Sequence, residues 1–158
     1  MFEIVENVKL EMKNVLSFKG EVAQQDMSYI MQEIEKIVLE NGAEKNGPIV
    51  TATFDVHKKG NHTIMAVQVL LPLSKAISVP NGYELKPIFR LNNAIKVIHK
   101  GNPEYLQESV DKLMQYIEEK GLMTITPGYN IALNVPNKQE NFEEFCAEVY
   151  VGVCDNIL

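Results

Sequence analysis

The sequence predicts an α+β fold in which two pseudo-symmetric βαββ units form one antiparallel sheet with two long helices on one face. Gly20 and Gly101, each preceded by a lysine, each precede a long amphipathic stretch. Gly42 and Gly121 end these stretches, and alternating apolar runs follow each of them. The separation between Gly20 and Gly101 is nearly the same as that between Gly42 and Gly121. Such a constant offset across several elements indicates a duplicated unit.

The first unit, residues 1–71, begins with a strand, because apolar and charged residues alternate from Val8 to Phe18. A helix of about five turns is expected from Glu21 to Gly42, where a glycine can turn left-handed past the last turn. Its apolar residues fall on one stripe: Val22, Met27, Ile30, Met31, Ile34, Ile37 and Val38. Residues 49–56 and 63–71 are β-rich runs around a polar turn, which is typical of a hairpin.

The second unit, residues 83–153, follows a connector at residues 72–82 that contains two prolines. A strand, or a pair of short strands bent near Asn92-Asn93, is expected over residues 88–99, and Asn102-Pro103 is typical of a helix start. The helix carries an apolar stripe of Leu106, Val110, Leu113, Met114 and Ile117 and ends at Gly121. Two strands, residues 129–135 and 145–153, enclose a polar loop at 136–144, so the whole chain, residues 1–158, is predicted to be one domain.

Composition excludes several classes of function. The net charge of −6 disfavours binding to nucleic acid and to anionic membranes, because no cluster of lysine and arginine offsets it. The N-terminus lacks the features of a signal peptide, and no apolar run is long enough to span a membrane, so a cytoplasmic location is expected. Phosphate-binding loops, metal-ligand spacings and nucleophile motifs are absent from the sequence, so we expect no cofactor and no metal site.

Glu148 is the strongest candidate for a functional residue. One face of the last strand is apolar throughout, as expected for a face under the helices: Phe145, Ala147, Val149, Val151 and Val153. The other face carries Glu148 and, two residues later, Tyr150. A carboxylate in such a strand either faces water or lies in a cleft. The offset of the duplication places Gln68, also a lone polar residue in an apolar run, at the equivalent position of the first unit.

Aromatic residues near the strand starts could line the same cleft. Tyr83, Phe89 and Tyr129 take such positions, and aromatic walls beside a carboxylate suit a flat or cationic organic ligand. Taken alone, each of the three fits a core residue better than a binding residue. The predicted ligand-binding residues are therefore Glu148, Tyr150, Tyr129, Tyr83, Phe89 and Gln68, in a cleft at the seam between the two units.

Two segments resemble the GyrI-like, or effector-binding, domain family. The run 94–106, AIKVIHKGNPEYL, is similar to the family's strand, His-x-Gly turn, aromatic residue and helix start. Residues 147–153, AEVYVGV, are similar to its closing strand, although Gly152 replaces the usual proline. The resemblance implies a duplicated βαββ fold whose central cleft binds small organic molecules, often lipophilic cations, with Glu148 at its base and Tyr150 beside it.

Three functional interpretations follow from the sequence. The first is a stand-alone protein that binds an aromatic or lipophilic cation for sensing, sequestration or protection. The second is a hydrolase of small electrophiles, in which Glu148 would activate water and Tyr150 would orient or donate a proton; the residues themselves assign no catalytic role. The third is a binding module for a protein partner or a second copy of the chain, in a fold that has lost its ligand.

Overall fold

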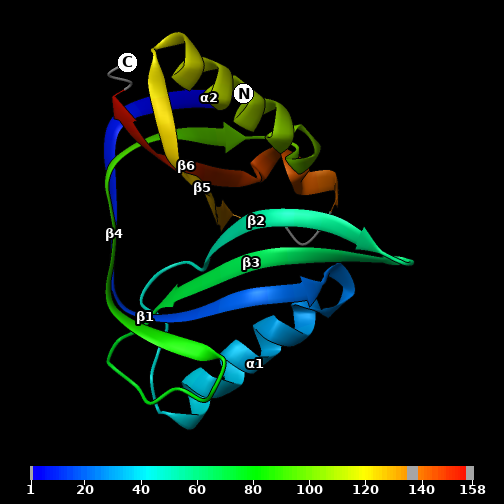
Figure 1. Cartoon of the computed structure of the whole chain (residues 1–158), viewed down its shortest axis with the longest axis vertical. Coiled ribbons are helices and arrows are strands. Elements are labelled where there is room, and N and C mark those ends of the chain that lie inside the picture. Colours follow the sequence, from blue (N-terminus) through cyan, green and yellow to red (C-terminus); the bar gives the residue numbers. More distant parts are fainter. Residues whose placement is uncertain (1, 135–138, 156–158) are drawn as a thin grey trace. The chain divides into compact units, whose positions relative to one another are not determined.

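The computed structural model describes residues 2–134 and 139–155 of the chain and shows an α+β fold. Contacts divide it into two compact units, which we call the N-terminal unit (residues 12–89) and the C-terminal unit (residues 1–11 and 90–158). Figure 1 shows the helices and strands, which are β1 (Phe2–Ala23), α1 (Met27–Glu40), β2 (Val50–Lys59), β3 (His62–Pro72), β4 (Tyr83–Lys100), α2 (Leu106–Glu119), β5 (Leu122–Asn134) and β6 (Cys146–Asp155).

In the N-terminal unit, β3 lies between β1 and β2 and pairs antiparallel with both. Helix α1 covers one face of these strands (Figure 1). Its buried residues Ile34, Ile37 and Val38 pack against the strands in a core that also contains Leu16, Val69, Leu71 and Leu73. The predicted stripe from Met27 to Val38 therefore faces the core, whereas Val22, which was also assigned to it, belongs to β1.

The C-terminal unit repeats this arrangement, with β6 between β4 and β5 and antiparallel to both. Leu113 and Ile117 of α2 pack on the sheet face formed by Ile95, Val97, Val149, Val151 and Val153. The prediction that the apolar face of the last strand lies under a helix is confirmed. Met114, however, is exposed, because only Leu113 and Ile117 of the predicted stripe point fully into this core.

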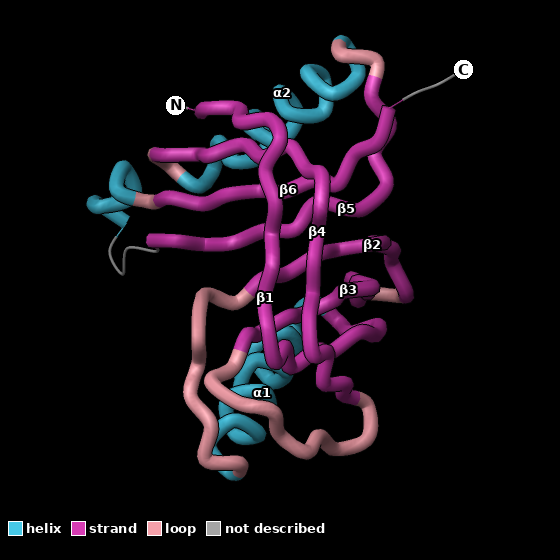
Figure 2. Tube along the Cα trace, turned by 90° about the vertical axis from the view of Figure 1, so that its left-hand side faces the viewer, coloured by secondary structure: helices cyan, strands magenta, loops and turns pink. Residues whose placement is uncertain are grey.

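The two long strands, β1 and β4, each contribute residues to both units, and Figure 2 shows them as continuous strands. The predicted start of the first helix at Glu21 is wrong. Residues 21–23 instead continue β1, because they pair with residues 64–66 of β3, and the helix begins at Met27. Pairing across the sheet here outweighs the helical periodicity of the local sequence.

The predicted helix ends are confirmed. Gly42 and Gly121 have φ angles of 62° and 71°, in the left-handed region that glycine adopts readily. At the start of the second helical segment, the Asn102 side chain accepts a hydrogen bond of 2.9 Å from the Glu104 backbone N–H, and Pro103 follows it. These residues fix where β4 stops and the helix begins.

The last part of the chain differs from the prediction in two places. β5 begins at Leu122, directly after the helix, and not at residue 129, because residues 122–124 pair with residues 153–155 of β6. Residues 139–144, predicted as part of a loop, form a 3₁₀ helix. Residues 135–138, which include the predicted end of one strand and start of that loop, lie outside the described residues.

Some predictions concern the relation between the two units and stay predictions: one continuous sheet with both helices on one face, a single domain of 1–158 with a connector at 72–82, and a cleft at the seam. Across residues 2–134 and 139–155, no helix is long and apolar enough to cross a membrane. The same residues contain no group of three or more histidine, cysteine or acidic side chains that could hold a metal ion.

Candidate ligand-binding site

Glu148 lies on the face of the β4–β6–β5 sheet that α2 does not cover. Its neighbours in β6, Ala147 and Val149, are buried, and Val149 packs against α2. Because side chains alternate along a strand, Glu148 and Tyr150 point to the opposite face. The Glu148 side chain is 13% exposed, so the carboxylate is largely withdrawn from water.

A lysine from the neighbouring strand pairs with this carboxylate. Lys96 Nζ donates a hydrogen bond of 2.6 Å to Glu148 Oε2, and the Lys96 side chain is 18% exposed. The ammonium also lies 3.4 Å from the Tyr150 hydroxyl oxygen and 5.3 Å from the centre of the Tyr150 ring. It is therefore held by a carboxylate and by an aromatic ring together.

Strand register brings these side chains together. Tyr150 lies opposite Lys96 of β4 on one side and opposite Tyr129 of β5 on the other. Directly opposed residues share a sheet face, and a long side chain also reaches the diagonal neighbour, as Lys96 reaches Glu148. The Tyr150 hydroxyl donates to Glu148 Oε1 at 3.4 Å, so both carboxylate oxygens have a donor from the chain.

Burial and charge shift the pKa values of three of these groups. Burial lowers the pKa of Lys96, but its hydrogen bonds and charge interactions with Glu148 and Tyr150 raise that pKa more, so it lies above the ordinary lysine value. Burial, followed by the charge of Glu148, raises the pKa of Tyr150, and Lys96 opposes this effect. Burial alone raises the pKa of Tyr129. The phenols thus stay protonated and can donate hydrogen bonds at neutral pH.

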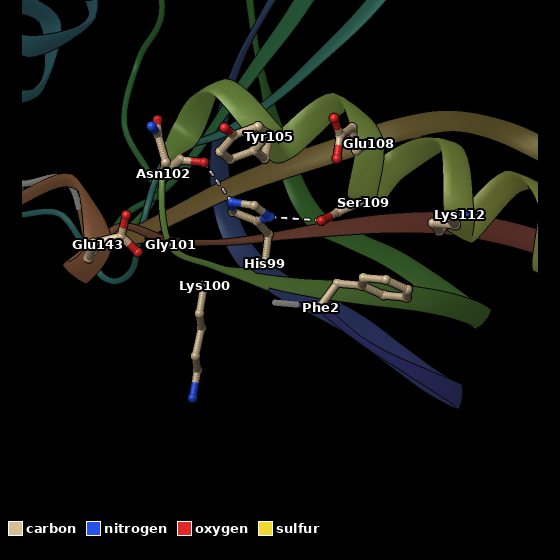
Figure 3. A pocket seen from close by; sticks show the side chains of 10 residues that line it. All are labelled: Phe2, His99, Lys100, Gly101, Asn102, Tyr105, Glu108, Ser109, Lys112 and Glu143. Atoms are coloured by element: carbon tan, nitrogen blue, oxygen red, sulfur yellow. Dashed lines mark hydrogen bonds between the residues drawn. The ribbon is translucent and has the colours of Figure 1, made fainter.

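A separate cavity of about 620 Å³ lies on the α2 side of the C-terminal unit, at the start of that helix. Figure 3 shows His99, Tyr105, Ser109 and Lys112 at this cavity. His99 is buried, and its Nε2–H donates to the Asn102 carbonyl oxygen at 3.0 Å, while its Nδ1 accepts from the Ser109 hydroxyl at 2.7 Å. With both nitrogens bonded, His99 fixes the turn before the helix and has no free nitrogen for chemistry.

Comparison with known proteins shows the fold. No family model and no curated protein match the sequence. Among solved structures, the C-terminal domain of EcmrR is similar to this chain with a TM-score of 0.71 and 16% identity, over 99% of each chain. The chain has the GyrI-like effector-binding fold. In the EcmrR–DNA complex the TM-score is 0.76 at 18% identity, over 98% of this chain and 58% of the EcmrR chain, so this chain spans less than two thirds of that protein.

Two further structures share the GyrI-like fold. A hydrolase from Listeria innocua has a TM-score of 0.54 and 14% identity, over 97% of this chain and 91% of its own. SAV2435, bound to tetraphenylphosphonium, has a TM-score of 0.53 and 13% identity, over 98% of this chain and 94% of its own. At such low identities the comparisons show a common fold and no more.

Within the GyrI-like fold, the structure brings together three of the six predicted binding residues: Glu148, Tyr150 and Tyr129. The other three, Gln68, Tyr83 and Phe89, belong to the N-terminal unit. Gln68 is buried opposite Lys19 of β1 and Ala52 of β2. Tyr83 packs against Phe18, with 5.6 Å between ring centres. Their participation in a site with Glu148 stays a prediction.

Lys96 is the functional candidate that the sequence analysis missed. A signal was present, because Lys96 is the lone charged residue between Ala94 and Ile98, just as Glu148 is the lone charged residue between Ala147 and Val153. Two single charges of opposite sign in two apolar strands are expected to pair if the strands are neighbours. The register that opposes Lys96 to Tyr150 is what places them within reach.

Gly152, which stands where the GyrI-like pattern has proline, takes part in a close contact with β5. Its N–H donates a 2.8 Å hydrogen bond to Thr126 Oγ1, which a proline could not do. A Cβ at this position would lie 2.8 Å from Thr126 Cγ2. The irregular pairing of β5 between Thr124 and Gly128 is therefore anchored by a glycine in β6.

Proposed function

We propose that this chain binds a small aromatic organic molecule on the face of the C-terminal unit that carries Glu148. The observation that supports this most is the Lys96–Glu148 pair, flanked by Tyr150 and Tyr129 and largely withdrawn from water. Charged side chains withdrawn this far from water are unusual, because lysine and glutamate mostly lie on the exposed surface. They are a recognised mark of functional sites.

A buried ion pair is weak evidence for a contribution to stability. Replacing a buried ion pair by apolar side chains of similar size is often neutral or stabilising in other proteins. A pair kept in such a place is therefore better explained by what it binds. Lys96, Tyr150 and Tyr129 lie opposite one another on three neighbouring strands, and Glu148 lies diagonally beside Lys96. Together these side chains offer hydrogen-bond donors, an acceptor and aromatic surface.

The role of such binding is ligand sensing, sequestration or protection. One protein with this fold supports the binding of a small organic molecule, since SAV2435 is bound to tetraphenylphosphonium. The preference for lipophilic cations expected from the sequence treats Glu148 as an unpaired carboxylate. Its pairing with Lys96 changes that expectation.

Hydrolysis of a small electrophile is the second candidate. One contact favours it: the Tyr150 hydroxyl lies 3.4 Å from Glu148 Oε1, a carboxylate–phenol arrangement that could activate water and protonate a leaving group. A structural relative is a hydrolase. Against it, each Glu148 oxygen already accepts a hydrogen bond from the chain, which leaves fewer lone pairs to hold and activate a water molecule.

A thermal-shift screen of aromatic compounds tests the proposed function. Compounds that stabilise the wild-type protein should stabilise Glu148→Gln much less. Their affinity should fall by about tenfold or more, because an amide cannot accept the charge-assisted hydrogen bond that the Glu148 carboxylate accepts from the ligand. Tyr150→Phe should cost less. Glu40→Gln, which removes an exposed carboxylate from α1, is the matched control and should behave as wild type. No stabilisation by any compound would favour the protein-partner interpretation.

A further inference from the structure

The place beside Glu148 where an organic cation would bind is already filled by the chain. Lys96 Nζ lies 2.6 Å from the carboxylate and 5.3 Å from the centre of the Tyr150 ring. A carboxylate next to an aromatic face is the arrangement that attracts a cation. Here both partners are satisfied by an ammonium that belongs to the protein.

A cationic ligand could use Glu148 only by displacing this ammonium. The exchange replaces one carboxylate–cation contact by another, so the ligand gains little from the charge of Glu148. After this exchange, the displaced ammonium of Lys96 either stays near the bound cation or moves into water. If it stays, the two positive charges repel each other at short range. By contrast, a ligand without charge meets a site whose two charges cancel and whose donors and acceptor can hydrogen-bond to it.

We infer that Lys96 sets the charge class of the ligand: it excludes permanent organic cations from Glu148, so that this chain selects uncharged aromatic molecules with hydrogen-bonding groups. The inference rests on the proposed function and adds to it the residue that determines specificity. Lys96 acts by occupying the cation position, whereas Glu148, Tyr150 and Tyr129 supply the surroundings of that position.

The equivalent place in the N-terminal unit has no charge pair. Helix α1 begins at Met27 and helix α2 at Leu106. The same separation along the chain makes Ser17 the counterpart of Lys96. The offset of the last strands relates Glu148 to Gln68. Ser17 and Gln68 are both buried and uncharged. Lys96 and Glu148 therefore have uncharged counterparts in the N-terminal unit, where the residue opposite Gln68 in β1 is Lys19.

Two aromatic probes of similar size test the inference by calorimetric titration: tetraphenylphosphonium, a permanent cation, and triphenylphosphine oxide, which is uncharged. Wild type should bind the oxide more tightly than the phosphonium. Lys96→Gln keeps a hydrogen-bond donor next to Glu148 and should bind the phosphonium about tenfold or more tightly than wild type does. Lys96→Arg keeps the cation and should behave as wild type.

Lys36→Gln is the matched control, since Lys36 also pairs with a glutamate, Glu40, but on the exposed surface of α1. It removes the same charge and should leave both affinities unchanged. Equal phosphonium affinities of wild type and Lys96→Gln would overturn the inference while leaving the proposed function intact, provided the probes bind. Failure of both probes to bind any of these proteins would overturn the proposed function as well.

A measurement on the wild-type protein keeps the test decisive if Lys96→Gln does not fold. The Nζ resonance of Lys96, observed by NMR in lysine-labelled protein, reports whether its ammonium stays paired with Glu148. An excess of tetraphenylphosphonium should leave this resonance unchanged. A saturable shift of the resonance on adding the phosphonium would show that the cation displaces Lys96, which contradicts the inference.

Discussion

Lys96 and Glu148 form an ion pair of 2.6 Å on the sheet face away from α2, and neither side chain is more than a fifth exposed. Removing one partner leaves the other charge poorly hydrated. We expect Lys96→Met and Glu148→Leu each to lower the free energy of unfolding by about 1 to 3 kcal/mol, less than for a fully buried pair because some water reaches both groups.

The double variant Lys96→Met with Glu148→Leu should cost less than either single change, because no unpaired charge remains. Denaturant unfolding of the four proteins measures this coupling. Lys36→Met, which breaks an exposed pair with Glu40, should change stability by no more than about 0.5 kcal/mol. Additive losses in the double variant would show that the two side chains do not interact in solution.

The phenols of Tyr129 and Tyr150 should ionise at higher pH than those of the unfolded chain. Burial raises both pKa values, and the charge of Glu148 adds to the effect on Tyr150. Absorbance titration of the folded protein and of the protein in denaturant detects the difference. Lys96→Gln should raise the pKa of Tyr150 further, because Lys96 lowers it; a lower value in this variant would contradict the assigned geometry.

The free energy of unfolding should fall as the pH rises into the alkaline range. The folded chain holds the protons of Tyr129, Tyr150 and Lys96 more tightly than the unfolded chain does. Their contribution is therefore complete below about pH 10 and is lost as the pH rises through the raised pKa values. Tyr129→Phe with Tyr150→Phe should reduce the fall in the free energy of unfolding above that pH. An unchanged fall would assign it to other groups.

Gly152 should not tolerate a side chain. In Gly152→Ala the new methyl group would meet Thr126 Cγ2 at 2.8 Å, so we expect a loss of about 1 to 3 kcal/mol from overpacking. Thr126→Ser removes that methyl group and keeps the hydroxyl that accepts from the Gly152 N–H. The serine change should therefore recover much of the loss when combined with Gly152→Ala. No recovery would place the strain elsewhere.

His99 should be a structural residue. Because it is buried and both nitrogens are hydrogen-bonded, His99→Ala should lower stability by about 2 to 4 kcal/mol, as measured by denaturant unfolding. His62→Ala, at an exposed hairpin position, should stay within about 0.5 kcal/mol of wild type. Retained binding of aromatic compounds by a folded His99 variant would agree with its place outside the site; complete loss of binding would not.

The sequence predicted those parts of the fold that local patterns determine. Both helices, their glycine ends and the helix-facing side of the last strand follow from periodicity, as Val149 and Val151 show. The length of β1 did not follow, because its last residues, 21–23, lack a regular alternation and are held by pairing with residues 64–66 of β3. Glu148 and Tyr150 were found from one strand alone. Lys96 was not, because its place beside Glu148 depends on the register between two strands that lie far apart in the sequence.

The location of a bound ligand tests the central claim most directly. We propose an NMR titration of the labelled wild-type protein with whichever aromatic compound stabilises it most. We expect saturable shifts at Lys96, Tyr129, Glu148 and Tyr150, on the face of the β4–β6–β5 sheet away from α2. Shifts confined to His99, Tyr105 and Ser109, around the cavity at the start of α2, would contradict it.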